Sequence, residues 1–179
     1  MVSDIRIRAL DRALLALLAL SLVSPMAAAH KAHTHGVGDL DVAVDGGRIS
    51  LALTVPAADV VGFEHAPRKD SQREAVAAAE KLLRSQAELF ALPTSARCRF
   101  LSADVTVPWA GDADAAGDEH SDFAARWEFE CAEPAQLAFI EVRIAAKLSG
   151  NLKLRTTILD ERGQRRAEIT RSRTRLALR

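Results

Sequence analysis

Two stretches in the first third of the chain alternate between apolar and polar positions, as strands with one buried face do. Apolar side chains stand at positions 40, 42 and 44, and again at positions 49, 51, 53 and 55. Between them, Asp45-Gly46-Gly47 supplies residues that favour tight turns. The pattern predicts a β-hairpin that ends at Pro56.

A helical period replaces this alternation over residues 71–91, where apolar side chains recur every three or four positions. Further strands are expected at residues 97–107, 123–131 and 138–146. Residues 152–160 and 165–178 are expected to form a final hairpin or meander. Short connections between strands favour antiparallel pairing. The predicted fold class is therefore α+β, with a single antiparallel β-sheet and one main amphipathic helix packed on it.

The start of the chain follows neither pattern. Arginines at positions 6, 8 and 12 precede an apolar run over residues 13–23, which is followed by Pro25 and three alanines. A basic segment, a short apolar run and small residues are typical of a secretory signal peptide, while a membrane anchor needs a longer run. We expect cleavage after Ala29 and a single mature domain, residues 30–179, in the periplasm of a Gram-negative-type envelope.

Composition limits the partners of this domain. The chain has 24 basic and 24 acidic residues, and only 4% of its residues are aromatic. This balance argues against nucleic-acid binding, which favours a basic excess. The charges are nevertheless segregated, because residues 30–142 carry a net charge of −9 and residues 143–179 carry +8. This segregation indicates either a basic docking face for a membrane protein or anionic partner, or an ordinary solvated sheet face.

The two cysteines, Cys98 and Cys131, each lie next to a predicted strand. An exported protein meets an oxidising compartment, where a disulfide persists. The spacing lacks the C-x-x-C pattern of thiolate metal sites. We favour a structural disulfide over the alternative, a pair of metal-binding thiolates.

The five histidines carry the candidate chemistry. His30, His33 and His35 fall within six residues, His65 follows Glu64, and His120 lies in an aspartate-rich loop. Imidazole is a favoured zinc ligand, and alternate residues of an extended segment project from one face. His33, His35 and His65 could therefore form the core of a Zn(II) site, with His30, Glu64, His120 or water as further ligands. The alternative is a solvated, flexible histidine-rich tail.

These residues also resemble a known family. The histidine-rich mature start at residues 30–36, the F-E-H-A-P element at residues 63–67, the helix that follows and the two strand cysteines are similar to the periplasmic zinc-uptake ZrgA family. The resemblance implies a zinc-binding protein that serves a zinc importer, with His33, His35 and His65 as its main ligands. Family members often carry a long histidine run in the middle loop, which here is aspartate-rich and holds only His120.

We therefore expect a monomeric periplasmic protein that captures Zn(II) through histidines and delivers it to components of an inner-membrane ABC-type zinc importer. One alternative is a copper-handling protein in which the amine and imidazole of His30 chelate Cu(II). Another is a metal-free envelope adaptor. An enzyme is not expected, because no nucleophile or general base has an identifiable partner.

Overall fold

A computed structural model describes residues 35–109, 121–148 and 151–178. By contacts the chain divides into two units, Met1–Ala32 and His33–Arg179, and all described residues belong to the second. The strands are β1 (Val37–Asp45), β2 (Arg48–Pro56), β3 (Phe90–Ala91), β4 (Cys98–Thr106), β5 (Asp122–Cys131), β6 (Phe139–Val142), β7 (Lys153–Asp160), β8 (Gly163–Ile169) and β9 (Arg175–Ala177). The helices are α2 (Ala57–Val61), α3 (Asp70–Arg84), α4 (Gln86–Leu89) and α5 (Ile144–Lys147), with short 3₁₀ turns at Thr94–Ala96 and Pro134–Gln136.

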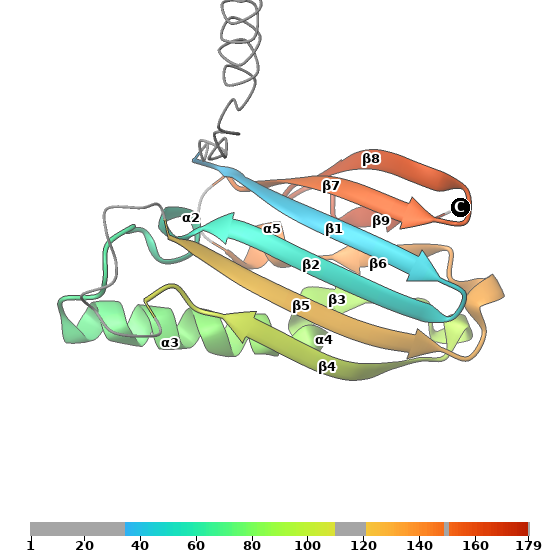
Figure 1. The fold of residues 1–179 in the computed structure, drawn as a ribbon, viewed down its shortest axis with the longest axis horizontal. Coiled ribbons are helices and arrows are strands. Elements are labelled where there is room, and N and C mark those ends of the chain that lie inside the picture. Colours follow the sequence, from blue (N-terminus) through green and yellow to red (C-terminus); the bar gives the residue numbers. More distant parts are fainter. Residues whose placement is uncertain (1–34, 110–120, 149–150, 179) are drawn as a thin grey trace, which may run out of the picture. The chain divides into compact units, whose positions relative to one another are not determined.

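The expectation of a single antiparallel sheet with one main helix is wrong. The described residues are mostly β and form two sheets, one of six strands in the order β4-β5-β2-β1-β7-β8 and one of three strands in the order β3-β6-β9 (Figure 1). The large sheet is mixed, because β1 pairs with β7 in parallel while the other neighbours are antiparallel. The strands of the small sheet have two to four residues, which is too short for a clear alternating pattern.

The predicted hairpin is confirmed as β1 and β2. Asp45 pairs with Arg48, so that Gly46 and Gly47 form a two-residue loop. Gly46 has a φ of +55°, which glycine adopts without strain. A Cβ atom at Gly47 would lie 2.5 Å from the carbonyl oxygen of Cys131, so only glycine fits beside the end of β5.

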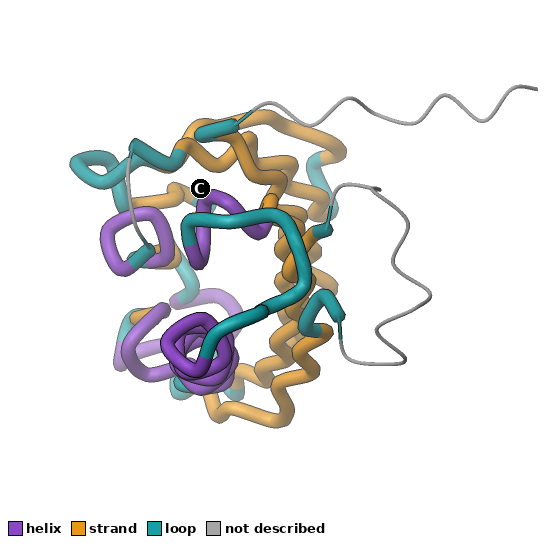
Figure 2. The backbone as a smooth tube through the Cα atoms, turned by 90° about the vertical axis from the view of Figure 1, so that its left-hand side faces the viewer, coloured by secondary structure: helices purple, strands orange, loops and turns teal. Residues whose placement is uncertain are grey.

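One face of the large sheet carries the core, because every second residue of its inner strands is buried. The helices and the small sheet lie on this face (Figures 1 and 2). Trp127 of β5 is fully buried, and its indole Nε1 donates a hydrogen bond of 2.8 Å to the carbonyl oxygen of Leu83 in α3. Phe90 packs edge-on against the Trp127 ring, with 4.9 Å between centroids. These contacts fix α3 against the sheet.

The helix predicted over residues 71–91 is shorter in the structure. α3 ends at Arg84, and Ser85 leaves the helical backbone before the single turn of α4. Phe90 then pairs with Val142 as part of β3. Leu89 and Phe90 continue the apolar spacing of a helix in the sequence. In the structure Phe90 instead belongs to a strand, and its ring packs against Trp127 and Phe129.

The C-terminal hairpin is confirmed for β7 and β8 and ends sooner than predicted. Residues 170–174 turn away from the large sheet, and β9 pairs with β6 instead. The strand predicted over residues 138–146 likewise stops at Val142, where the chain enters α5. No helix among the described residues is long and apolar enough to cross a membrane.

Asp160 at the β7–β8 turn stabilises the β7–β8 hairpin through side-chain contacts. Its side chain is only 7% exposed and forms ion pairs with Arg165 and Arg162. It also accepts a hydrogen bond from the backbone of Arg162. The hydrogen bond from Arg165, followed by those from Arg162, lowers the pKa of the Asp160 carboxyl below its ordinary value of 3.8. The ionised carboxylate therefore favours the folded state.

Replacing Asp160 by asparagine is expected to lower the free energy of unfolding at neutral pH. Because the folded pKa lies below the unfolded one, this contribution is present above about pH 4 and is lost as the pH falls through the folded pKa. The stability difference between wild type and variant should therefore shrink in acid, as measured by urea unfolding. Asp41→Asn, on an exposed position of β1, is the control. A stability difference that persists unchanged in acid would contradict the role of the charge.

Candidate metal centre

The topology brings several chain segments to one end of the large sheet. β1, β5 and β7 begin at this end and β2 finishes there. Lys153, which begins β7, donates its backbone N–H to the carbonyl oxygen of Gly36 at 2.9 Å. Ala57, which follows β2, donates its N–H to the carbonyl oxygen of Ser121 at 2.8 Å. We call this region the histidine end, because His35 lies two residues before β1 and Ser121 immediately follows His120 in the sequence.

His35 and Glu64 meet at the histidine end. The Nδ1 atom of His35 lies 3.7 Å from Oε1 of Glu64, although the two residues are far apart in the sequence. Two donors on one tetrahedral zinc ion, each with a bond of about 2.0–2.1 Å, are about 3.3 Å apart. A small adjustment of either side chain would therefore let both contact one ion. The His35 side chain is 68% exposed and that of Glu64 is 32% exposed, so an ion can reach them from solvent.

A backbone contact fixes the position of His35. Gly36, the next residue, donates its N–H to both carboxylate oxygens of Asp59 in α2, each at 2.9 Å. Gly36 has a φ of +77°, a conformation that favours glycine. Together with the bond from Lys153, this contact engages both the N–H and the carbonyl oxygen of Gly36. Asp59 is thus a positioning residue that the sequence analysis missed, since a single aspartate in a short helix gives no distinctive signal.

His65 lies in the loop between α2 and α3. Its Nδ1 lies 2.8 Å from the carbonyl oxygen of Ala66, which can only accept a hydrogen bond. Neutral His65 therefore carries its proton on Nδ1 and keeps the lone pair of Nε2 for a metal ion. The His65 ring stacks on Phe63, with 5.3 Å between centroids, and Phe63 stacks on Trp109, with 5.6 Å between centroids. This ring stack connects the loop to the segment after β4.

The described part of the chain includes three of the six predicted ligands. It brings His35 and Glu64 into proximity and places His65 next to Glu64 in the same loop. His30, His33 and His120 lie outside the described residues. Within residues 35–109, 121–148 and 151–178, no group of three or more His, Cys, Asp or Glu side chains is arranged to hold a metal ion. The full ligand set stays a prediction.

Replacing Asp59 by asparagine tests the positioning role. The amide oxygen can accept only part of the interaction that the two carboxylate oxygens make with Gly36, and it carries no charge. Zinc affinity is expected to fall roughly tenfold, as for outer-shell partners of metal ligands. Calorimetry measures the affinity, and the visible spectrum of bound Co(II) reports whether the ligand set is unchanged. Asp70→Asn, at the exposed start of α3, is the control; equal affinities of Asp59→Asn and wild type would rule the role out.

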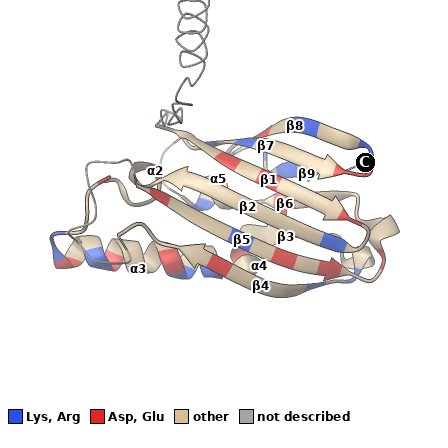
Figure 3. Cartoon of the chain, in the orientation of Figure 1, with Lys and Arg blue, Asp and Glu red and all other residues tan. Residues whose placement is uncertain are grey.

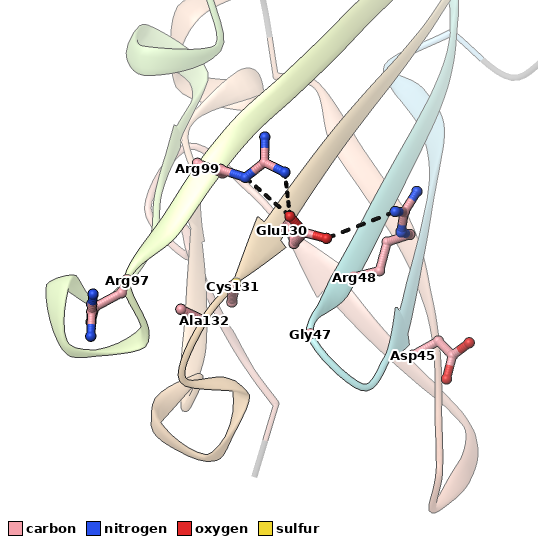
Figure 4. A pocket seen from close by; sticks show the side chains of 8 residues that line it. All are labelled: Asp45, Gly47, Arg48, Arg97, Arg99, Glu130, Cys131 and Ala132. Carbon is pink, nitrogen blue, oxygen red and sulfur yellow. Dashed lines mark hydrogen bonds and ion pairs between the residues drawn. The ribbon is translucent and has the colours of Figure 1, made fainter.

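The cysteines lie away from this region. Cys98 and Cys131 face each other at the start of β4 and the end of β5, opposite the histidine end, and form the predicted disulfide. Their sulfurs are therefore not available as thiolate ligands. A cavity of about 370 Å³ lies beside them, where Glu130 accepts a hydrogen bond of 3.0 Å from Arg99 and pairs with Arg48 at 3.8 Å (Figure 4). These ion pairs satisfy the charge of Glu130, and no metal donor set forms there.

Imidazole nitrogens and carboxylate oxygens are both ligands in zinc-binding proteins, so His35 and Glu64 are a candidate donor pair for that class of protein. Comparison with protein families supports this class. The family model described as ZrgA family zinc uptake protein matches residues 32–178. The chain therefore belongs to the ZrgA family, whose described role is zinc uptake. No curated protein matches the chain.

Proposed function

We propose that this chain is a periplasmic zinc-binding protein that captures Zn(II) and passes it to an inner-membrane ABC-type zinc importer. In this proposal residues 1–29 are a signal peptide that is removed on export, and the mature monomer begins with His30. The zinc ion is cargo, and the protein performs no catalytic step. Membership of a zinc uptake family supports a role in bringing zinc into the cell.

The observation that carries this proposal is the 3.7 Å contact between His35 and Glu64. One neutral nitrogen donor and one anionic oxygen donor suit Zn(II), which accepts both. His65, with Nε2 available, follows Glu64 directly and is the next candidate ligand. In the sequence, His30 and His33 precede His35 by only a few residues, and His120 immediately precedes Ser121. Ser121 itself lies at the histidine end. We propose that the remaining ligands come from these three histidines.

Exposure of the donor pair supports transfer rather than permanent binding. Structural zinc sites are closed by four buried ligands, whereas His35 is mostly exposed. A partner can approach such an ion and replace the ligands one at a time. The contact between Asp59 and Gly36 holds the backbone next to His35 in place.

Calorimetric titration of the mature, tag-free protein, residues 30–179, with Zn(II) tests the proposal. Stoichiometric binding with a tetrahedral Co(II) spectrum would support a zinc cargo site. A parallel titration with Cu(II) and measurement of its coordination geometry separate zinc from copper handling, because Cu(II) favours tetragonal coordination. Mass spectrometry of the exported protein locates its N-terminus. Absence of zinc binding in the mature protein would overturn the proposal.

A further inference from the structure

A small basic surface lies close to the candidate metal centre. It consists of Lys153, Arg171 and Arg173, all of which are exposed. The two arginines belong to a closed turn after β8, in which Thr170 and Arg173 exchange backbone hydrogen bonds of 2.9 and 3.2 Å. The Thr170 hydroxyl also accepts a bond of 3.1 Å from the Arg173 N–H. The turn therefore presents its side chains on a fixed backbone.

Strand register places Lys153 and the end of β8 at the histidine end, and the turn with Arg171 and Arg173 leaves the large sheet from there. Ile169, the last residue of β8, pairs with Leu154 of β7, and Lys153 pairs with Val37 at the start of β1. Neighbouring strands lie about 4.8 Å apart, so the end of β8 is about 10 Å from the start of β1. Figure 3 shows Lys and Arg positions in blue along β8, the strand that leads into this turn.

Four other basic side chains of the C-terminal segment form ion pairs with neighbouring carboxylates. Arg155 makes two bonds of 2.9 Å to Asp39, Arg162 and Arg165 pair with Asp160, and Lys147 pairs with Glu88. Among the described residues, Lys153, Arg171 and Arg173 have no ion-pair partner, and the same holds for Arg143, Arg166 and Arg175, of which Arg175 lies over the Phe139 ring. Three of the unpaired basic side chains, Lys153, Arg171 and Arg173, thus belong to segments that meet at the histidine end.

We propose that this basic surface docks the protein on an acidic face of the protein that receives its zinc, an inference that rests on the proposed function. The histidine end then has two parts with different roles. Glu64 and Asp59 supply negative charge where the cation binds, and the basic surface, two strands away, steers and orients an acidic acceptor. An acceptor of zinc carries carboxylates and imidazoles around its own site, so its entrance suits a basic partner.

A protein fits this end better than a phospholipid bilayer does. A bilayer of anionic lipid presents uniform negative charge, which would attract the basic surface and also repel the nearby carboxylates of Glu64 and Asp59. A protein face can place acidic groups opposite the basic surface alone. No large apolar side chain is among the three residues to insert into lipid.

The test uses the charge-reversal variant Arg171→Glu/Arg173→Glu. Its matched control is Lys81→Glu/Arg166→Glu, which makes the same change in net charge at exposed residues of α3 and mid-β8. Each variant replaces the native gene in its own strain, and the initial rate of zinc accumulation is measured under zinc limitation. Zinc affinity of the purified proteins is measured by calorimetry. We expect the uptake rate of the Arg171/Arg173 variant to fall on the order of tenfold, with zinc affinity within about twofold of wild type, as electrostatic steering predicts.

Several results would overturn this inference. Unchanged uptake in the Arg171/Arg173 variant, or an equal loss in the control, would show that the basic surface does not dock. A loss of zinc affinity in the variant would assign these residues to the metal site itself. Binding of the wild type to vesicles of phosphatidylcholine and phosphatidylglycerol, with loss in the variant, would assign the surface to lipid. Failure of the proposed function is separate, because it would appear as absent zinc binding in the wild type.

Discussion

Replacing His33 and His35 together by alanine is expected to weaken zinc binding by more than about 100-fold. In the proposed site both are direct ligands, and the loss of direct ligands exceeds the roughly 10–100-fold cost of losing outer-shell partners. The fold should survive, since His35 is an exposed residue that precedes β1. Calorimetry of the mature protein measures the affinity, and circular dichroism with urea unfolding checks the fold.

The matched control is Lys31→Ala/Thr34→Ala, which alters the same segment without removing an imidazole. Single variants His35→Ala, Glu64→Gln and His65→Ala divide the loss among the described candidates. Glu64→Gln keeps the size of the side chain and removes its charge, so it tests the carboxylate that lies 3.7 Å from His35. If the double variant bound zinc as tightly as its control, the histidine end would not be the cargo site.

Replacing both Cys98 and Cys131 by alanine is expected to lower the free energy of unfolding by about 3–4 kcal/mol. The disulfide closes a loop across a sequence separation of 33 residues, and its loss returns conformational entropy to the unfolded chain. Alanine avoids burying a hydroxyl at Cys131, which is 4% exposed. Urea unfolding of variant and wild type, with and without reductant, measures the difference.

Zinc affinity should change little in this variant, because the disulfide lies at the end of the sheet opposite His35. Reductant should destabilise the wild type and leave the variant unaffected, which makes the variant its own control for the reduced state. Equal unfolding free energies of the two proteins without reductant would contradict a stabilising disulfide.

Local patterns predicted the elements that depend on nearby residues. The β1–β2 hairpin followed from strict alternation around Gly46 and Gly47, and the β7–β8 hairpin from a turn next to Gly163. The helix was found at the correct place, but its end was misjudged, because helical spacing of Phe90 cannot reveal that its ring packs on Trp127 in a strand. The small sheet was missed because its strands are short and distant in the sequence.

The sequence by itself determined the candidate donors, the cysteine pair and the resemblance to a zinc uptake family. These are properties of residue type and local spacing, which a single chain displays directly. Only the tertiary structure decided that β1 pairs with β7, that Asp59 holds Gly36, and that His35 lies beside Glu64. Each of these contacts joins residues more than 20 positions apart. Such pairings depend on how the sheet and core pack as a whole. Short-range periodicity in the sequence does not specify that packing.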